Sequence, residues 1–148
     1  MAVPTDTEVR LQLYRDFIES GRPPSISRVA GLMGAPLEAV RAAFERLAAG
    51  KAIVLQPTSR EVLMANPLSA VPSPFLVRTG GRAFFGSCVW DGLGIIAMLQ
   101  AGGTLETSCS CCGEAMSIDV RDGEPQPVEG VIHFAIPARR WWENIVFT

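Results

Sequence analysis

The sequence carries little net charge of either sign. Its 148 residues include 13 Lys and Arg against 15 Asp and Glu, which gives a formal net charge of −2 at pH 7. A protein with so weak an overall field is not held on nucleic acid or on an anionic membrane by charge alone. We therefore expect neither a nucleic acid nor a membrane among its partners.

Long hydrophobic runs are also missing. Residues 1–10 lack the apolar run of a signal peptide, and no stretch of about 18 apolar residues that could cross a membrane occurs in the chain. The expectation is a cytoplasmic protein. In that reducing compartment the four cysteines, Cys88, Cys109, Cys111 and Cys112, would be free thiols or metal ligands rather than disulfides.

Histidine is scarce, and the sequence contains no recognisable Ser/His/Asp arrangement or phosphate-binding loop. The single histidine, His133, lies in the apolar run 131–136, which we predict to be a strand. A lone histidine on a strand is more often a surface or core residue than a catalyst. We therefore look for reactive groups among the cysteines and carboxylates.

The sequence divides into two halves of different character. Residues 1–65 hold eight Lys or Arg against seven Asp or Glu, whereas residues 66–148 hold five against eight, together with all four cysteines. Hydrophobic residues make up 48% of the chain, enough to bury a sizeable core. This change of composition predicts a helical domain at 1–65, a proline-rich connector at 66–80 and a small α/β domain at 81–148.

The first half is predicted to be winged-helix-like. Thr5 and Glu8 have the spacing of a helix capping box, and glycine or proline closes each of three helical segments. Two short apolar runs then predict a hairpin. The helical segments are 5–20, 26–33 and 36–49, and the hairpin strands are 52–55 and 61–64.

A winged helix often binds DNA, and the third helix would be the one that reads it. This helix offers Arg41 and Arg46, but Glu38 and Glu45 balance them. Because affinity for DNA rests on cationic contacts with phosphates, we favour a structural module packed on its neighbour.

The second half predicts mixed secondary structure, so the fold class is α+β. Strands are expected at 82–85, 104–108, 116–120 and 131–136, with a helix at 90–99. An apolar end at 141–147 either packs in the core or is a cut edge.

Cys88 and Asp91 are the strongest candidates for chemistry, because they occur where a turn feeds a helix. Free backbone N–H groups and the helix dipole would stabilise a thiolate at this position. A carboxyl three residues later can face the same way and deliver a proton. The alternative is a buried cysteine beside an ordinary acid of the first helical turn.

A second group of thiols, Cys109, Cys111 and Cys112, precedes the turn residue Gly113. Three thiols within four residues cannot all bind one tetrahedral metal without further ligands. The spacing suits a linear, two-thiolate soft ion better than structural zinc.

The chain resembles the organomercurial (alkylmercury) lyase family. The resemblance rests on three segments, which are residues 47–55 (LAAGKAIVL), residues 64–75 (MANPLSAVPSPF) and residues 88–91 (CVWD). The Cys-x-x-Asp after the proline-rich connector is its most specific part. The resemblance implies a winged-helix-like N-terminal domain that is not known as a DNA reader.

The resemblance also implies the chemistry, which is protonolysis of a carbon–mercury bond in a small molecule. Cys88 would be the thiolate that captures mercury and Asp91 the proton donor, and Cys109 matches a structural cysteine. No cofactor is required, and the mercury ion is the bound product, with Cys88, Asp91, Cys111 and Cys112 as its possible ligands.

In this family a second catalytic cysteine follows shortly after a segment like 142–148, whereas the present sequence ends at Thr148. We expect either a truncation or the loss of that cysteine, with Cys111 or Cys112 as its substitute. Two alternatives to a lyase remain open. One is a non-catalytic protein that binds soft metals or thiol ligands, and the other is a winged-helix regulator with a cysteine sensor.

Overall fold

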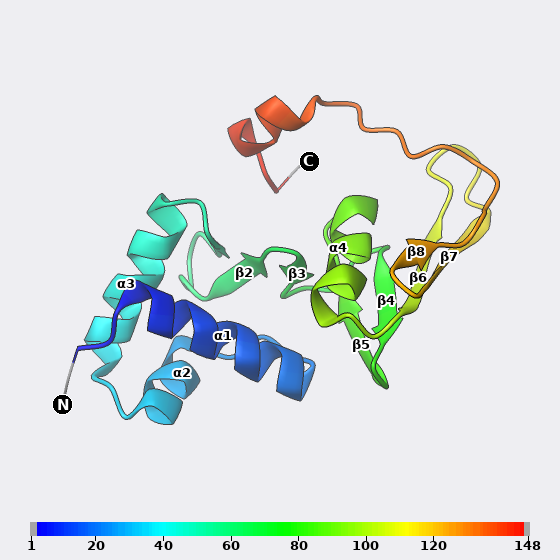
Figure 1. Ribbon diagram of the computed structural model, residues 1–148. Coiled ribbons are helices and arrows are strands. Elements are labelled where there is room, and N and C mark those ends of the chain that lie inside the picture. The colour runs from blue at the N-terminus through cyan, green and yellow to red at the C-terminus, as the bar shows by residue number, and fades with distance from the viewer. Residues whose placement is uncertain (1–2, 147–148) are drawn as a thin grey trace.

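The computed structural model describes residues 3–146 and shows a helical half, a long antiparallel sheet that carries one further helix, and an irregular C-terminal segment (Figure 1). The predicted α+β class is confirmed. The helices are α1 (Asp6–Ser20), α2 (Ile26–Met33), α3 (Leu37–Ala49), α4 (Val89–Leu99) and a 3-10 helix, η1 (Ala138–Glu143). The strands are β1 (Val54–Leu55), β2 (Val62–Ala65), β3 (Leu68–Ser69), β4 (Leu76–Thr79), β5 (Arg82–Phe85), β6 (Gly103–Ser108), β7 (Ala115–Arg121) and β8 (Glu124–Pro125).

Local signals set the ends of the first helices. The amide of Glu8 donates to Thr5 Oγ1 at 3.3 Å and the amide of Thr5 donates to Glu8 Oε2 at 2.8 Å, so the predicted capping box is confirmed. Gly21 ends α1 with a φ of 70°. Arg28 of α2 then holds the buried carboxylate of Asp16 of α1 through its Nε and Nη2 atoms, at 2.5 and 2.6 Å.

One sheet joins the two halves of the chain. Its strand order is β1-β2-β3-β5-β4-β6-β7-β8, and every neighbouring pair is antiparallel. The segment 66–80, which the sequence predicts as a connector, contributes β3 and β4 to this sheet. The hairpin that follows α3 is therefore continuous with the strands that carry the cysteines.

Helix α4 covers one face of the sheet, against β4 and β6. Its buried side chains, Ile95 and Ile96, belong to the same hydrophobic core as Val77 and Leu105 of the strands. Because that core also includes the apolar faces of α1, α2 and α3, burial of apolar surface ties the two halves together.

The predicted strand at 131–136 is wrong. These residues have no regular structure, and Val131 is 92% exposed. Strand β8, rather than this segment, pairs with β7 at Val120 and Arg121. A strand requires a partner for its backbone groups, and alternating hydrophobicity cannot say whether one is present.

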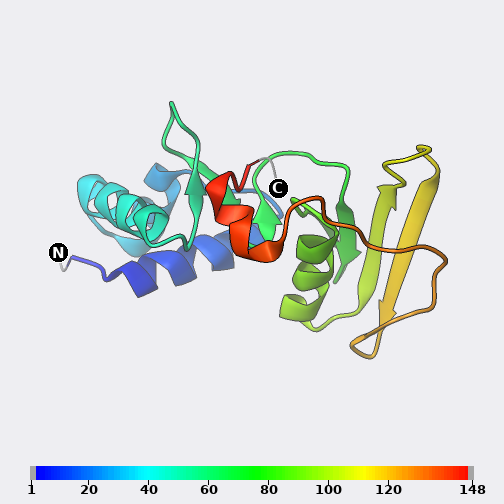
Figure 2. The same cartoon turned by 90° about the horizontal axis from the view of Figure 1, so that it is seen from above.

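The apolar C-terminal segment returns across the molecule instead of entering the core. Figure 2 shows it running from the β7–β8 end of the sheet, past α4, to the helical half. The ring of Trp141 packs on Phe134 at 5.1 Å between centroids, and Lys51 Nζ lies 5.7 Å from the centre of the Trp142 ring. Phe147, the last member of the expected apolar end, lies outside the described residues.

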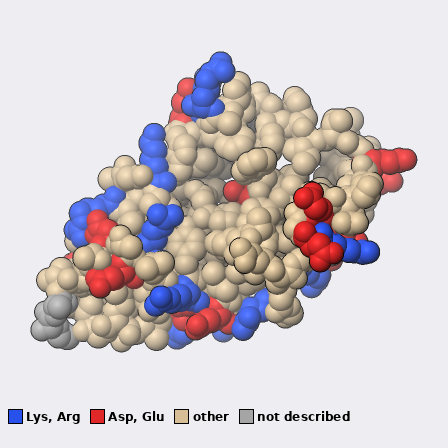
Figure 3. Space-filling model, in the orientation of Figure 1, with Lys and Arg blue, Asp and Glu red and all other residues tan. Residues whose placement is uncertain are grey.

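The arginines of the predicted DNA-reading region are paired with carboxylates. Arg46 Nη2 contacts Asp6 at 2.6 Å, Arg60 Nε donates to Glu45 at 2.9 Å, and Arg41 Nε lies 3.7 Å from Glu38. Figure 3 accordingly shows positive and negative side chains interspersed over the helical half. Such a surface presents little unbalanced positive charge to a phosphate backbone. Among residues 3–146, no helix is long and apolar enough to cross a membrane.

Gly86, directly after β5, allows the chain to touch the start of α4 at Gly92. A Cβ atom built on Gly86 would lie 2.7 Å from the amide nitrogen of Gly92 and 3.1 Å from its Cα. Both contacts are with backbone atoms, so no side-chain rotation could relieve them. This close approach determines where the first turn of α4 lies relative to the sheet.

We therefore expect Gly86→Ala to destabilise the protein by about 1–3 kcal/mol, the usual cost of forcing an extra carbon into a packed site. Gly31→Ala is the matched control. Gly31 lies within α2 and a Cβ there would meet nothing within 4 Å, so this change should stabilise the helix by about 0.5–1 kcal/mol. Chemical denaturation of both variants measures the difference, and equal stabilities would contradict the close approach.

Candidate active site

Cys88 is the N-cap residue of α4. Its backbone is extended, with φ −154° and ψ 179°, and its Sγ atom accepts a hydrogen bond from the amide of Asp91 at 3.4 Å. A serine or threonine hydroxyl usually fills this role. A thiol in its place gives the helix a weaker cap but puts a soft, polarisable atom at the start of α4.

The carboxylate of Asp91 points back toward the same cap. It accepts hydrogen bonds from the backbone N–H of Ser87 and from the thiol of Cys88. This arrangement differs from a capping box, because the carboxylate accepts from the amide of Ser87, the residue before the cap, rather than from that of Cys88. The spacing that singled out Cys88 and Asp91 in the sequence corresponds to a direct contact, because the amide of Asp91 donates to the sulfur of Cys88.

Burial raises the pKa of both groups. For the Cys88 thiol, burial outweighs the backbone hydrogen bond from Asp91, and the neighbouring carboxylate raises the pKa further. For Asp91, burial outweighs the hydrogen bonds from Ser87 and Cys88. The backbone hydrogen bonds at the helix start lower the pKa of Cys88, as the sequence predicts, but burial outweighs them, so the pKa of each group lies above its ordinary value.

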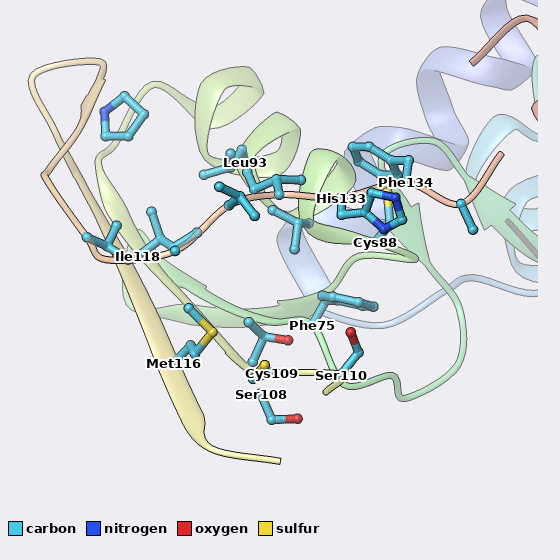
Figure 4. A pocket seen from close by; sticks show the side chains of 18 of the residues that line it. Phe75, Cys88, Leu93, Ser108, Cys109, Ser110, Met116, Ile118, His133 and Phe134 are labelled. Carbon is cyan, nitrogen blue, oxygen red and sulfur yellow. The ribbon is translucent and has the colours of Figure 1, made fainter. Parts of the chain in front are cut away.

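Cys88 opens onto a cavity of about 630 Å³. The walls come from four places, which are the residue before β4, the start of α4, the β6–β7 hairpin, and the irregular segment after β8. Figure 4 shows Cys88 and Cys109 on different parts of this lining, with Phe75 between them in that view. The labelled lining residues are mostly apolar, which suits a small hydrophobic molecule.

Cys109 is the second thiol on the cavity wall. The backbone N–H groups of Cys112 and Cys111 and the thiol of Cys112 donate to its sulfur, and these hydrogen bonds lower the pKa of Cys109. Cys111 and Cys112 themselves are exposed and do not contribute to the lining. The residues from 3 to 146 include no cluster of three or more His, Cys, Asp or Glu side chains able to hold a metal ion, so the four predicted mercury ligands do not converge.

Two contributors to the site were not found from the sequence. His133 lines the cavity from the irregular segment, where a strand pattern gave no information about its position. Tyr14 of α1 donates its hydroxyl to the carbonyl oxygen of Asn66 at 2.6 Å. Burial raises the pKa of Tyr14, and the charge of Asp91 raises it further, so the helical half reaches the neighbourhood of the Cys88–Asp91 pair.

Comparison with known proteins shows the family of the chain. The sequence model of the alkylmercury lyase family, MerB, matches residues 68–148, which is more than half of the chain. The chain belongs to the alkylmercury lyase family. The matched residues include β3, the cavity walls that carry Cys88 and Cys109, and the irregular segment after β8. No curated protein sequence matches the chain.

A solved structure has a similar fold. The crystal structure of the mercury-bound form of MerB2 superimposes with a TM-score of 0.64 at 24% sequence identity. The match covers 81% of this chain and 59% of the MerB2 chain, so the present chain spans about three fifths of that protein's length.

The two cavity thiols should differ in reactivity. Because the thiolate is the nucleophile, and the pKa of Cys109 is lowered while that of Cys88 is raised, Cys109 should be alkylated severalfold faster than Cys88 at neutral pH. Limiting iodoacetamide followed by peptide mass spectrometry measures both rates in one sample. Faster labelling of Cys88 would contradict the pKa directions.

The buried carboxyl should make stability depend on pH. A raised folded-state pKa means that Asp91 stabilises the fold when protonated, and that this contribution is lost as pH rises through the folded pKa. Asp91→Asn keeps the shape without the charge, so it should unfold at a higher temperature than the parent at pH 7. The difference should shrink toward pH 3, and thermal scans across this range would show whether it does.

Proposed function

We propose that this chain cleaves the carbon–mercury bond of small organomercury compounds, with Cys88 as the mercury ligand and Asp91 as the proton donor. The observation that carries the proposal is the hydrogen-bonded Cys88–Asp91 pair, whose thiol opens onto a largely apolar cavity. Membership of the alkylmercury lyase family supports the same chemistry.

In the first step the sulfur of Cys88 displaces the anionic ligand from the mercury atom of the substrate, and that ligand leaves as a free anion. A metal displaces the proton of a thiol when it binds, and the carboxylate of Asp91 already accepts a hydrogen bond from that thiol. The proton therefore passes from Cys88 to Asp91 as the sulfur–mercury bond forms. Burial favours this outcome, because it raises the pKa of the carboxyl that receives the proton.

In the second step the carbon–mercury bond breaks. Asp91 gives its proton to the carbon atom, and the electron pair of the carbon–mercury bond becomes that of the new carbon–hydrogen bond. The hydrocarbon leaves, the mercuric ion stays on Cys88, and Asp91 is again a carboxylate. Because the proton comes from the protein at short range, neither a cofactor nor a free acid is needed.

A second thiol would strengthen the hold on the ion. The sequence predicts Cys111 or Cys112 for this role, and no observation tests either assignment. Cys109 has the better position, because it lines the cavity that Cys88 also lines and carries the lowered pKa. We therefore propose Cys109 as the second sulfur that faces the substrate.

The non-catalytic alternative also fits the thiols. A protein that only binds soft ions would need the two cavity sulfurs but not a proton donor beside one of them. The contact between Asp91 and the Cys88 thiol therefore favours the lyase. The regulator is disfavoured, because the arginines on α3 and in the β1–β2 turn are paired with carboxylates.

Two substitutions separate binding from cleavage. Cys88→Ser keeps an N-cap oxygen for α4 but removes the soft ligand, so it should lose both mercury binding at this position and hydrocarbon release. Asp91→Asn keeps the thiol and removes the proton donor. It should still bind a phenylmercury compound but release benzene at least about 100-fold more slowly.

Benzene release is measured by gas chromatography in the presence of excess small thiol, and bound mercury by mass spectrometry. Circular dichroism of each variant shows whether the fold is kept. Mercury binding without benzene release by the parent protein would favour the non-catalytic alternative. Full turnover by Cys88→Ser would remove Cys88 from the mechanism.

A further inference from the structure

Backbone hydrogen bonds fix both ends of the turn between β6 and β7. The two strands pair from Gly103 and Val120 to Ser108 and Ala115. Beyond that last pair, the amide of Cys109 donates to the carbonyl of Glu114, and the amide of Gly113 donates to the carbonyl of Cys109, both at 2.8 Å. Gly113 has a φ of 76°, which glycine adopts without strain.

This geometry brings two of the three turn cysteines together. The bond from Gly113 to Cys109 spans four residues, as in one turn of a helix, so residues three apart lie on the same side. A hydrogen bond from the Cys112 side chain contributes to the lowered pKa of Cys109, in agreement with two side chains on the same side of the turn. Cys111 contributes its backbone N–H to that sulfur.

The two sulfurs have different surroundings. Cys109 is half-buried and lines the same cavity as Cys88, whereas Cys112 is exposed. Figure 4 shows Cys109 beside Ser108 at the hairpin edge of that cavity. The pair therefore extends from the cavity wall to the solvent, and it is separate from the Cys88–Asp91 contact at the start of α4.

We propose that Cys109 and Cys112 form a dithiol site for a two-coordinate soft metal ion, and that this site receives the mercuric ion left on Cys88. Thiolates bind soft ions preferentially. Two thiolates complete the coordination of an ion that prefers linear geometry, so no third ligand has to reach the site. The dithiol site is inferred from the geometry of the turn alone. Only the source of its ion rests on the proposed lyase activity.

The transfer balances without any further reactant. The sulfur of Cys109 attacks the mercury on Cys88 and loses its proton, which Cys88 takes up as its own sulfur–mercury bond breaks. The sulfur of Cys112 then forms the second bond and releases its proton to water. The products are one mercuric ion held by two thiolates, a free Cys88 thiol ready for another substrate, and one proton in solution.

Binding can be tested without any catalysis. In the Cys88→Ser protein, mercuric chloride is added in the presence of excess small monothiol, and retained metal is measured by native mass spectrometry. We expect one ion to be retained. Cys88→Ser with Cys112→Ser should retain it at least tenfold more weakly, while Cys88→Ser with Cys111→Ser, the matched control, should behave like the single variant.

Each result of this binding test either supports or overturns the pairing of Cys109 with Cys112. Equal retention by the Cys112→Ser and control proteins, or loss caused by Cys111→Ser alone, would overturn the dithiol pairing. The serine at position 112 can still donate to the sulfur of Cys109, so the turn should persist, and circular dichroism verifies the fold. Because mercuric chloride is supplied directly, a failure of lyase activity would not affect this result.

Transfer is tested in the parent protein after a single turnover with a phenylmercury compound. Free thiols are alkylated and mapped by mass spectrometry. Labelled Cys88 with protected Cys109 and Cys112 supports the transfer. Protected Cys88 with a labelled turn would show that the ion stays where it was released, and the transfer would then be rejected.

Discussion

The close approach of Gly86 to Gly92 is the constraint on which the rest of the site depends. Because Gly86 has no side chain, the backbone leaving β5 can lie against the first turn of α4, and the absence of a side chain on Gly92 leaves room for Leu105 of β6. Cys88 is thereby placed at the helix cap while its sulfur still faces the cavity. The chain has only one residue, Ser87, between Gly86 and that cap, so a shift of the helix would move the sulfur with it.

The helix cap and the proposed chemistry use the same two side chains. The thiol of Cys88 satisfies a free amide of the helix, and the carboxylate of Asp91 accepts from the amide of Ser87 and from the thiol itself. Burial makes both groups hold their protons more firmly. A metal that binds the sulfur changes this balance, because it removes the thiol proton beside a group already poised to accept it.

The remainder of the molecule supports this pair from two sides. The helical half reaches it through Tyr14, which donates to the carbonyl of Asn66 in the loop between β2 and β3. The β6–β7 hairpin faces it across the cavity with Cys109, whose sulfur is held by the Cys111–Cys112 turn. Since both supports belong to one continuous sheet and core, the site is a property of the whole fold and not of either half.

The sequence by itself determined what is local. The capping box at Thr5, the glycine ends of α1 and α2, and the Cys88–Asp91 spacing all depend on residues within a few positions of one another, and the family resemblance rests on short segments. Only the tertiary structure decided which thiol shares the cavity with Cys88, that residues 131–136 form an irregular wall instead of a strand, and that burial raises the pKa of Cys88 against the effect of its helix. The physical reason is that pairing of backbone groups and loss of solvent depend on residues distant in the chain, which local pattern does not record.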